Sequence, residues 1–240
     1  MFFNGDINYK GISSNKFSLI VTEPPTIIHS EVKDEAVSVP GRDGDLHFAE
    51  VTHGDAQIKV VFGLATSTTN YKDVIRQVRN WLQGNGRLVI GDATDSYYEV
   101  KKVNISNDSR VVVNVGTIEA IFTVYPYEFL NIGDVGVSGT GKIINLNSDS
   151  NPLYKIRGSG NGTLSITNSN GSYSMTFTSA GTLYIDTMLK SAYDSSTPAK
   201  DKSNKVGGDY NKMKLANGEN IISITSGFTL TTYPRWGTVI

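Results

Sequence analysis

The segment TNYKDVIRQVRNWLQGNG, residues 69–86, decides much of the fold because it is the one stretch with a helical pattern. Its apolar side chains recur three and four positions apart, which places them on one face of an α-helix. They are Tyr71, Val74, Ile75, Val78, Trp81 and Leu82. Thr69 or Asn70 can cap the start of this helix. Asp73 complements the positive end of the helix dipole, and Gly84 can take the left-handed conformation that ends a helix.

Short strands surround this helix in the first half of the chain. Alternating or β-branched residues are typical of strands. They occur at residues 17–21, 36–39, 46–51, 57–64, 87–90, 97–103, 111–115 and 118–124. Since the helix closely follows the 57–64 strand, its apolar stripe is expected to pack on the sheet. Burial of each large apolar side chain contributes roughly 1.5–3 kcal/mol, so the stripe should be a main stabiliser of this part.

The second half of the sequence predicts strands only. They are expected at residues 142–146, 153–157, 163–167, 173–178, 182–186, 221–225 and 228–233. The pairs Asn161-Gly162 and Asn170-Gly171 favour hairpin turns, and Ala180-Gly181 and Asn217-Gly218 indicate two more reversals. Regular short strands of this kind are typical of a β-sandwich. Residues 191–211 are long, polar and Lys-rich, so we expect a surface excursion there.

A domain boundary is expected near residues 131–134, where a Gly/Ser-rich stretch of low hydrophobicity begins. We therefore predict domains at residues 1–132 and 133–240. Charge also changes there: residues 1–133 hold 12 Lys+Arg and 16 Asp+Glu, whereas residues 134–240 hold the remaining 10 and 7. The total of -1 is thus the sum of an acidic part and a basic part.

Composition excludes several classes of function. The chain has no cysteine, which removes disulfides, thiolate nucleophiles and Cys-ligated metals. A net charge of -1 gives no bulk attraction for nucleic acid or an anionic membrane. Asn4, Gly5, Asp6 and Asn8 interrupt the apolar run that a signal peptide needs. No apolar run approaches the ~20 residues that span a bilayer. Synthesis and folding in the cytoplasm are expected.

Residues 136–142, GVSGTGK, imitate a phosphate-binding loop. Ile143 follows where a Ser or Thr must hold magnesium, and the sequence continues as a strand instead of a helix. We interpret this segment as a linker.

No catalytic or metal site can be assembled from the remaining polar residues. The histidines, His29, His47 and His53, fit no metal-binding motif, and His47 is interpreted as a surface residue. No nucleophile elbow is present. A glycosidase needs two carboxylates held at a fixed separation, and the sequence of the second half identifies no such pair. Asp43, Asp45 and Asp55 do not reproduce a calcium loop. We therefore expect no enzyme activity, no cofactor and no metal.

One turn is more informative. Pro40 presets φ, Gly41 permits a positive φ, and Asp43-Gly44 is a hairpin-turn pair between two alternating strands. This predicts a tight hairpin with Arg42 at its tip. Arg42 is either simply solvated or part of an interface, and the candidate subunit interface is Gly41, Arg42, Asp43 and Gly44.

An ordered set of short motifs gives the sequence a resemblance to the distal tail proteins of long, non-contractile-tailed phages. In the first half the motifs are Phe3-Asn4-Gly5, residues 40–44, residues 78–82, residues 86–88, residues 92–100 and residues 125–128. In the second half they are Asn151-Pro152, residues 158–162, Ile185-Asp186, residues 218–220 and residues 234–236. The resemblance covers nearly the whole chain, and the order of the motifs makes it specific.

The resemblance implies a structural hub. It implies a mainly-β fold, with an N-terminal β-sandwich carrying one packed helix and a C-terminal galectin-like or carbohydrate-module-like β-sandwich. Members of this family form a hexameric ring at the distal end of the tail. The implied partners are a homohexamer, the major tail tube protein, the tail-associated tip protein, the tape measure protein and receptor-binding proteins. The implied location is the virion tail, with no nucleic-acid readout and no membrane insertion.

Two other functions stay open at this point. A hub of a phage-tail-like bacteriocin would share the sequence pattern. A cell-wall carbohydrate-binding module is the second alternative, because aromatic rings stack on sugars. Its candidate residues are Tyr154, Tyr173, Tyr184, Tyr193 and Tyr210, although alternation favours core positions for several of them.

Overall fold

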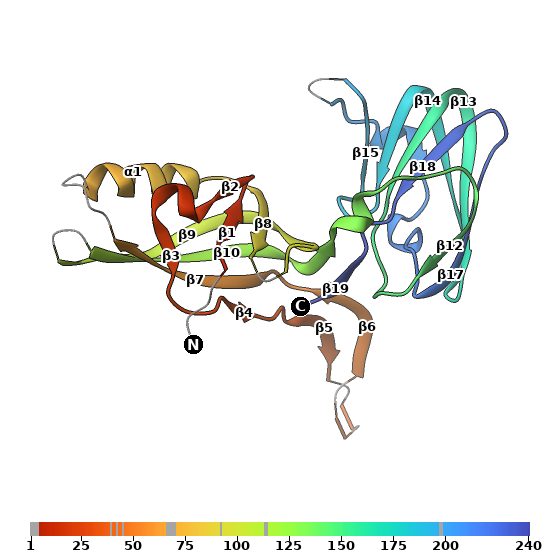
Figure 1. Ribbon diagram of the computed structural model, residues 1–240. Helices are drawn as coiled ribbons and strands as arrows, with labels where there is room; N and C mark the ends of the chain where they lie inside the picture. Colours follow the sequence, from red (N-terminus) through yellow and green to blue (C-terminus); the bar gives the residue numbers. More distant parts are fainter. Residues whose placement is uncertain are drawn as a thin grey trace. The chain divides into compact units, whose positions relative to one another are not determined.

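The computed structural model describes residues 5–38, 40–41, 43–44, 46–65, 71–91, 93–112, 115–196 and 199–240. The chain divides into two compact units, Met1–Glu128 with Val239–Ile240, and Phe129–Thr238. Strands dominate both units, and the described residues contain one α-helix. The expected mainly-β fold class with a single packed helix is therefore confirmed (Figure 1).

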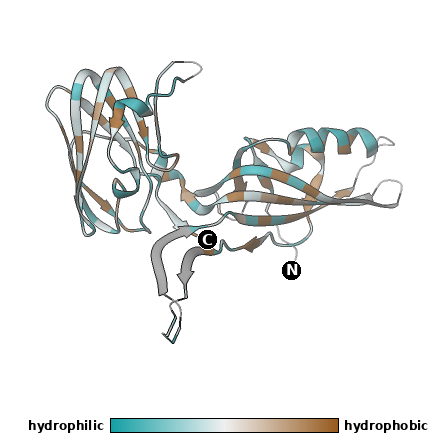
Figure 2. Cartoon of the chain, turned by 180° about the vertical axis from the view of Figure 1, so that it is seen from behind, coloured by the Kyte–Doolittle hydropathy of each residue, from teal (hydrophilic) through white to brown (hydrophobic). Residues whose placement is uncertain are grey.

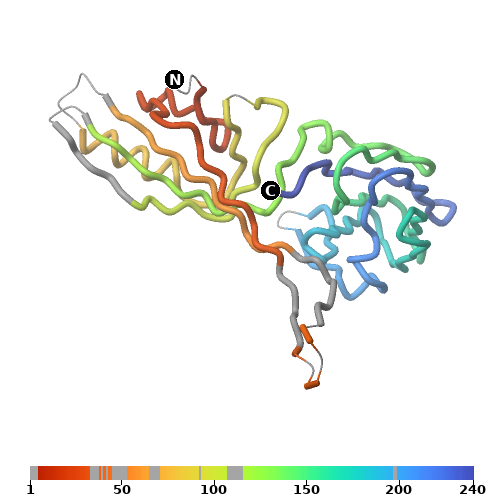
Figure 3. The backbone as a smooth tube through the Cα atoms, turned by 90° about the horizontal axis from the view of Figure 1, so that it is seen from below, coloured from red at the N-terminus to blue at the C-terminus, as the bar shows by residue number. Residues whose placement is uncertain are grey.

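Most of the first unit is one sheet in the order β2-β1-β8-β9-β10-β7-β3, with β4 also paired to β7 and β19 to β10. β7 and β10 form its centre through a ten-residue antiparallel register, from Val115 opposite Ala65 to Val124 opposite Ala56. Figure 3 shows β7, β9 and β10 running side by side. The strands are β1 (Ile7–Tyr9), β2 (Ile12–Ser13), β3 (Leu19–Val21), β4 (Thr26–Ile28), β7 (Ala56–Ala65), β8 (Gly86–Ile90), β9 (Ser96–Val112), β10 (Val115–Leu130) and β19 (Gly237–Val239).

Two strand predictions in this unit are corrected. Phe17 is not in a strand, because η1 (Ser14–Phe17) forms a 3-10 turn that the Ser13 side chain caps. Residues 111–115 are not one strand, since β9 ends at Val112 and β10 begins at Val115. Residues 113–114 lie outside the described part of the chain.

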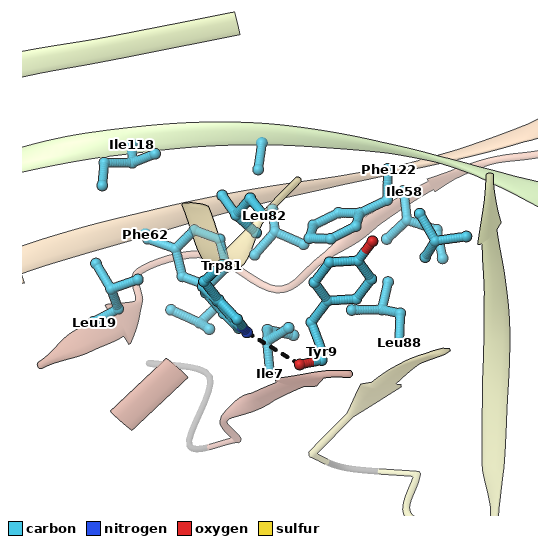
Figure 4. Close-up of a cluster of buried hydrophobic side chains, with 14 of the residues drawn as sticks. Ile7, Tyr9, Leu19, Ile58, Phe62, Trp81, Leu82, Leu88, Ile118 and Phe122 are labelled. Carbon is cyan, nitrogen blue, oxygen red and sulfur yellow. Dashed lines mark hydrogen bonds between the residues drawn. The ribbon is translucent and has the colours of Figure 1, made fainter. Parts of the chain in front are cut away.

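The predicted helix is confirmed as α1 (Tyr71–Trp81), packed on one face of the sheet (Figures 1 and 4). Ile75, Val78 and Trp81 are buried in the same core cluster as residues of β7 and β10. Alternating brown and teal along the strands and helix in Figure 2 shows the pattern that places this core. Gly84 has φ 81°, as predicted for the residue that ends the helix. The predicted caps Thr69 and Asn70 lie outside the described residues.

A two-stranded ribbon, β5 (Val32–Val37) with β6 (Leu46–His53), continues from β4 and leads into β7. The strands are antiparallel, with a register shift between Lys33 and Glu35. Strands are present on both sides of the predicted hairpin, with β5 ending at Val37 and β6 beginning at Leu46, and residues 39, 42 and 45 between them lie outside the described residues.

The second unit holds the other large sheet, in the order β11-β18-β13-β14-β15, with β12 joined through β17 to β13 and with β16 on β14. The strands are β11 (Val137–Ser138), β12 (Gly141–Asn145), β13 (Leu153–Asn168), β14 (Gly171–Asp186), β15 (Ser191–Asp194), β16 (Val206–Gly207), β17 (Gly218–Ile224) and β18 (Thr229–Tyr233). Short 3-10 turns are η2 (Asn131–Asp134), η3 (Ser203–Lys205) and η4 (Tyr210–Lys212).

β13 and β14 are continuous where the sequence predicts four strands. Asn161-Gly162 and Ala180-Gly181 are not turns, because both pairs lie inside the register that runs from Leu153–Asp186 to Asn168–Gly171. The glycines bend the strand instead. β13 pairs with β18 before the bend and with β17 after it, along the same edge. The reversal predicted at Asn170-Gly171 is confirmed: residues 169–170 connect the two strands.

Two segments of the second unit are more ordered than expected. Residues 191–211 contain β15, η3, β16 and η4, with Ala192 buried and Val206 and Tyr210 packed against the core. The stretch is Lys-rich overall, but its few apolar side chains anchor it to the core, and this explains why it is more ordered than a surface excursion. Residues 136–142 are not a linker, since β11 and β12 both pair within the second sheet.

Candidate functional site

The loop that carries the candidate interface is exposed. Gly41 and Gly44 have φ 83° and 80°, as the predicted turn chemistry requires. A Cβ at either glycine would have no atom within 4 Å. Glycine is therefore favoured at these positions by the positive φ and not by close packing. Asp43 is also exposed, whereas Arg42 lies outside the described residues. An interface at this loop stays a prediction.

The loop that imitates a phosphate-binding site has no phosphate cradle. Lys142 forms an ion pair with Glu219 of the neighbouring strand β17. The strand β12 begins at Gly141, so no helix N-terminus is presented at this point.

The histidines are dispersed. His29 follows β4 and is exposed, whereas His53 ends β6 and is partly buried. His47 lies in β6, and its side chain is outside the described part of the structure. Within the described residues no group of three or more His, Cys, Asp or Glu side chains could hold a metal ion.

Asp186 and Arg235 form a buried ion pair that the sequence did not predict. The Asp186 side chain is 1% exposed, and Arg235 donates to both carboxylate oxygens, at 2.7 and 2.8 Å. Asp186 also accepts from the backbone N–H groups of Met188 and Leu189, each at 3.0 Å. The pair is separated by 49 positions, so no local pattern could connect its members. Its contacts identify it as a support for the turn after β14.

Three further carboxylates of the second unit, Asp194, Asp201 and Asp209, also organise loops. Asp194 accepts from the backbone N–H groups of Ser196 and Lys200, both at 3.0 Å. The hydrogen bond from the Ser196 hydroxyl lowers the pKa of Asp194 most, and these backbone bonds lower it further. Asp201 and Asp209 each accept from a backbone N–H two residues later. Hydrogen bonds from Ser203 likewise lower the pKa of Asp201.

The five candidate tyrosines form no common exposed platform. Tyr154 is fully buried, and its hydroxyl donates to the Met213 carbonyl oxygen at 3.0 Å. Tyr173 and Tyr210 pack against the core. Tyr184 and Tyr193 are partly exposed and stack on each other, with ring centroids 5.3 Å apart. Most of this aromatic surface is therefore engaged within the unit, as the alternation favoured.

A shallow polar cleft of about 400 Å³ lies on the second unit, at a position where the sequence predicted a turn. Its lining comes from the middle of β13 and β14, from the end of η3 and from the residue after β17. The lining residues are Asn161, Gly162, Thr163, Thr176, Phe177, Thr178, Lys205 and Thr225. No local sequence pattern joins these residues, because their segments meet only through the pairing of β13 with β14 and β17 and of β14 with β16.

Among the described residues, none of the helices has the length and apolar character needed to cross a membrane.

These features define a class: a two-unit, mainly-β protein whose first unit carries one helix on a large sheet and whose second unit is a curled sheet. Among solved structures, the crystal structure of SPP1 Dit (gp 19.1) has this fold, with a TM-score of 0.66 and 10% sequence identity. The match covers 95% of this chain and 97% of that chain. That protein is described as a paradigm of the hub adsorption apparatus in phages that infect Gram-positive bacteria.

The resemblance to distal tail proteins is thus confirmed at the level of the fold. No protein-family model and no curated protein sequence matches the chain.

Proposed function

We propose that this protein is a structural hub at the distal end of a long, non-contractile phage tail. The observation that carries the proposal is the fold shared with SPP1 Dit over 95% of this chain and 97% of that chain. The match extends through both units. It therefore reflects the combination of the two units, and not merely a β-sandwich of the kind that many unrelated proteins contain. The ordered motifs of the sequence support the same role.

The proposed assembly is a hexameric ring built by the first unit. In a ring one surface meets a different surface on the neighbour, which is a heterologous contact. The β5–β6 ribbon is a suitable contact element, because within the described residues β5 and β6 pair only with each other. A two-stranded ribbon is only marginally stable alone, and its free edges can pair with a strand of another chain. The exposed loop between them, with Gly41, Asp43 and Gly44, then lies at the interface.

Within the tail, the ring would connect the tail tube to the tip protein and anchor receptor-binding proteins. The acidic balance of residues 1–133 and the basic balance of residues 134–240 would assist docking of differently charged rings. The tape measure protein is a further partner that passes through such a ring. The proposed role is structural and not enzymatic, and the proposed location is the virion tail.

The oligomeric state tests the ring directly. Mass photometry and native mass spectrometry over a range of protein concentrations should show a hexamer, either stable or forming as concentration rises. Pull-down with purified tube and tip proteins should show binding. A protein that stays monomeric at all concentrations and binds neither the tube protein nor the tip protein would contradict the proposal.

The candidate interface has its own test. Arg42→Ala should leave the circular dichroism spectrum and unfolding midpoint unchanged but lower the yield of rings. The control is Lys16→Ala, which removes an exposed cation from the first unit at η1, away from the loop. Equal ring yields for Arg42→Ala, Lys16→Ala and the wild type would remove Arg42 from the interface.

A tail-derived bacteriocin would use the same hub, and the neighbouring genes distinguish the two systems: capsid and DNA-packaging genes accompany an infectious phage.

A further inference from the structure

Strand β12 forms a free edge of the second sheet. Within the described residues β12 pairs only with β17, so one side of its backbone has no strand beside it. Figure 1 shows β12 next to β17. The backbone N–H and C=O groups on the free side of an edge strand can pair with a strand of another chain.

The outward face of this edge carries exposed apolar side chains. Ile144 of β12 is 57% exposed, Leu146 just after the strand is 85% exposed, and Ile221 of β17 is 48% exposed. Ile221 lies opposite Lys142 in the register, which makes it a diagonal neighbour of Ile144. Ile143 packs against the core of the unit instead. A cluster of exposed apolar side chains is typical of a contact surface.

Little in the sequence of this edge opposes the docking of another strand. Proteins commonly protect edge strands with charged side chains, proline or bulges. Residues 135–148 contain no Asp, Glu or Pro, and Lys142 is their one charged residue. Lys142 forms an ion pair with Glu219 of β17, so its charge is already compensated within the unit.

The β5–β6 ribbon supplies a second set of free edges, because its strands pair only with each other in the part of the chain that the structure describes. Residues 31–53 span the ribbon and its loop, and they hold six Asp or Glu and two Lys or Arg, a net charge of -4 with neutral histidines. The rest of residues 1–133 holds ten of each sign. The acidic excess of the first half therefore lies entirely in the ribbon segment.

Charge indicates which of these free edges pair. Two ribbons would bring together two segments of charge -4. Two β12 edges would bring together two copies of residues 134–240, which hold ten Lys or Arg and seven Asp or Glu. Like charges that face each other oppose association, and opposite charges favour it. A ribbon that docks on β12 is the combination that joins opposite charges.

We propose that a ribbon strand of one copy of this chain adds to the free side of β12 in a second copy. Backbone hydrogen bonds would extend the second sheet by one strand, and Ile144 and Leu146 would contact the added strand. Two different surfaces meet in this contact, which is the heterologous geometry that a ring requires. The inference rests on the self-assembly proposed above and names the surface that receives the ribbon.

Hydrogen exchange on the full chain locates the contact. As protein concentration rises into the range where oligomers form, amides of residues 141–146 and of the ribbon should gain protection together. Amides of β15, at another edge of the same sheet, should show no such gain. Added salt should reduce the gain, because it screens the attraction between the acidic ribbon and the basic second unit.

A variant of the edge tests the surface on β12. Ile144→Glu should weaken assembly at least about tenfold, because it places a carboxylate where the acidic ribbon docks. The matched control is Ile132→Glu: Ile132 is 63% exposed in η2, outside the edge, so assembly should be unchanged. Circular dichroism and unfolding midpoints establish that each variant folds. Ile144→Thr keeps a β-branched residue in the strand and should weaken assembly about threefold if Ile144→Glu does not fold.

A variant of the ribbon tests the other surface. Glu35→Lys removes part of the negative charge of the ribbon and should weaken assembly at least about fivefold. Glu23→Lys makes the same change at an exposed position outside the ribbon and should leave assembly unchanged.

A mixture of the two weakened variants tests the pairing itself. Ile144→Glu retains a wild-type ribbon, and Glu35→Lys retains a wild-type edge. At a concentration where each variant alone is monomeric, an equimolar mixture should associate again, because the ribbon of the first can dock on the edge of the second. Mass photometry measures this recovery, which pairing within a single chain cannot produce.

Several results would overturn the proposal. Hexamers without concentration-dependent protection of residues 141–146 would remove β12 from the contacts and leave the hub proposal standing. Equal losses for Ile144→Glu and Ile132→Glu would show that the effect is not specific to the edge. A mixture that stays monomeric would contradict the pairing of ribbon with edge. A monomer that binds the tube or tip protein would contradict this contact alone. Dimers or open chains with the expected pattern of variants would support the contact although the hexameric ring had failed.

Discussion

Trp81 is the residue on which the packing of α1 depends most. Its ring lies against Phe17 at 5.1 Å, Phe62 at 6.2 Å and Tyr9 at 6.3 Å between centroids. Figure 4 shows Trp81 with Phe62 and Tyr9. Its indole N–H donates to the Tyr9 carbonyl oxygen at 3.0 Å. One side chain therefore connects the helix to η1, to β7 and to β1.

Trp81→Ala should lower the free energy of unfolding by about 3–5 kcal/mol, because it creates a cavity and leaves the Tyr9 carbonyl without its donor. Urea unfolding followed by circular dichroism measures the loss. Trp81→Phe, which refills part of the space, should cost clearly less. Equal and small losses for both variants would show that the helix is held mainly by its other apolar residues.

The ion pair of Asp186 and Arg235 leads to a second residue-scale prediction. Arg235→Gln leaves a carboxylate that is 1% exposed without its cation, so the second unit should lose about 3 kcal/mol of stability. Arg157→Gln, at an exposed position of the same unit, is the matched control and should be nearly neutral. Hydrogen exchange should locate the loss at residues 186–191. If both variants unfold at the same urea concentration, the pair contributes little.

At the scale of elements, β13 and β14 show how glycines can shape a strand without ending it. Gly158 and Gly160 have φ 146° and 119°, and Gly181, opposite Gly158, has φ 136°. These values let the ribbon bend where side-chain-bearing residues would be strained. The bend allows β18 and β17 to share one edge of β13.

Gly162 is needed for a different reason, which is space for the Phe177 ring. Gly162→Ala would place a Cβ 2.5 Å from Phe177 Cζ and 3.0 Å from Phe228 Cε2, so we expect a loss of about 1–3 kcal/mol. Phe177→Leu should recover part of this loss in the double variant. Gly160→Ala is the contrast: its Cβ meets no atom within 4 Å, so its cost comes from φ alone and Phe177→Leu should not rescue it. A double-variant cycle with no coupling between positions 162 and 177 would contradict this account.

The same elements show how far sequence reasoning reaches. The 3.6-residue pattern of α1 and the reversal at Asn170-Gly171 are local properties, and both were predicted correctly. Asn161-Gly162 has the same local chemistry as Asn170-Gly171 but lies in mid-strand, because pairing with Thr178 and Phe177 overrides the turn preference. The polar cleft and the Asp186–Arg235 pair escaped prediction because long-range pairing brings their residues together.

At the scale of the whole molecule, each unit has a tyrosine in its core whose ionisation opposes folding. Burial raises the pKa of Tyr9 from 10.0 to about 12, and its hydroxyl donates to the Gly84 carbonyl oxygen at 2.6 Å. Burial also raises the pKa of Tyr154, whose hydroxyl donates to the Met213 carbonyl oxygen. In both units the neutral phenol is therefore the form compatible with the native core.

This arrangement predicts alkaline destabilisation of both units. A raised folded-state pKa means that the native state keeps its proton where the unfolded chain has lost it, so the stability contribution is complete below pH 10. For Tyr9 it is lost progressively as pH rises from 10 toward about 12. Urea midpoints measured across this range should fall, and tyrosinate absorbance should rise together with unfolding. Lysines also titrate near pH 10, so a control must isolate the phenols.

Tyr9→Phe provides that control. The variant should be less stable near neutral pH, because the hydrogen bond to Gly84 is lost, but its first unit should show a shallower decline above pH 10 than the wild type. Tyr154→Phe should have the same effect on the second unit alone. Hydrogen exchange of β7 and β14 peptides reports the two units separately. The contradicting result is a Tyr9→Phe variant that loses protection of its β7 amides with rising pH as steeply as the wild type does. In that case lysine titration, and not the buried phenol, causes the alkaline destabilisation of the first unit.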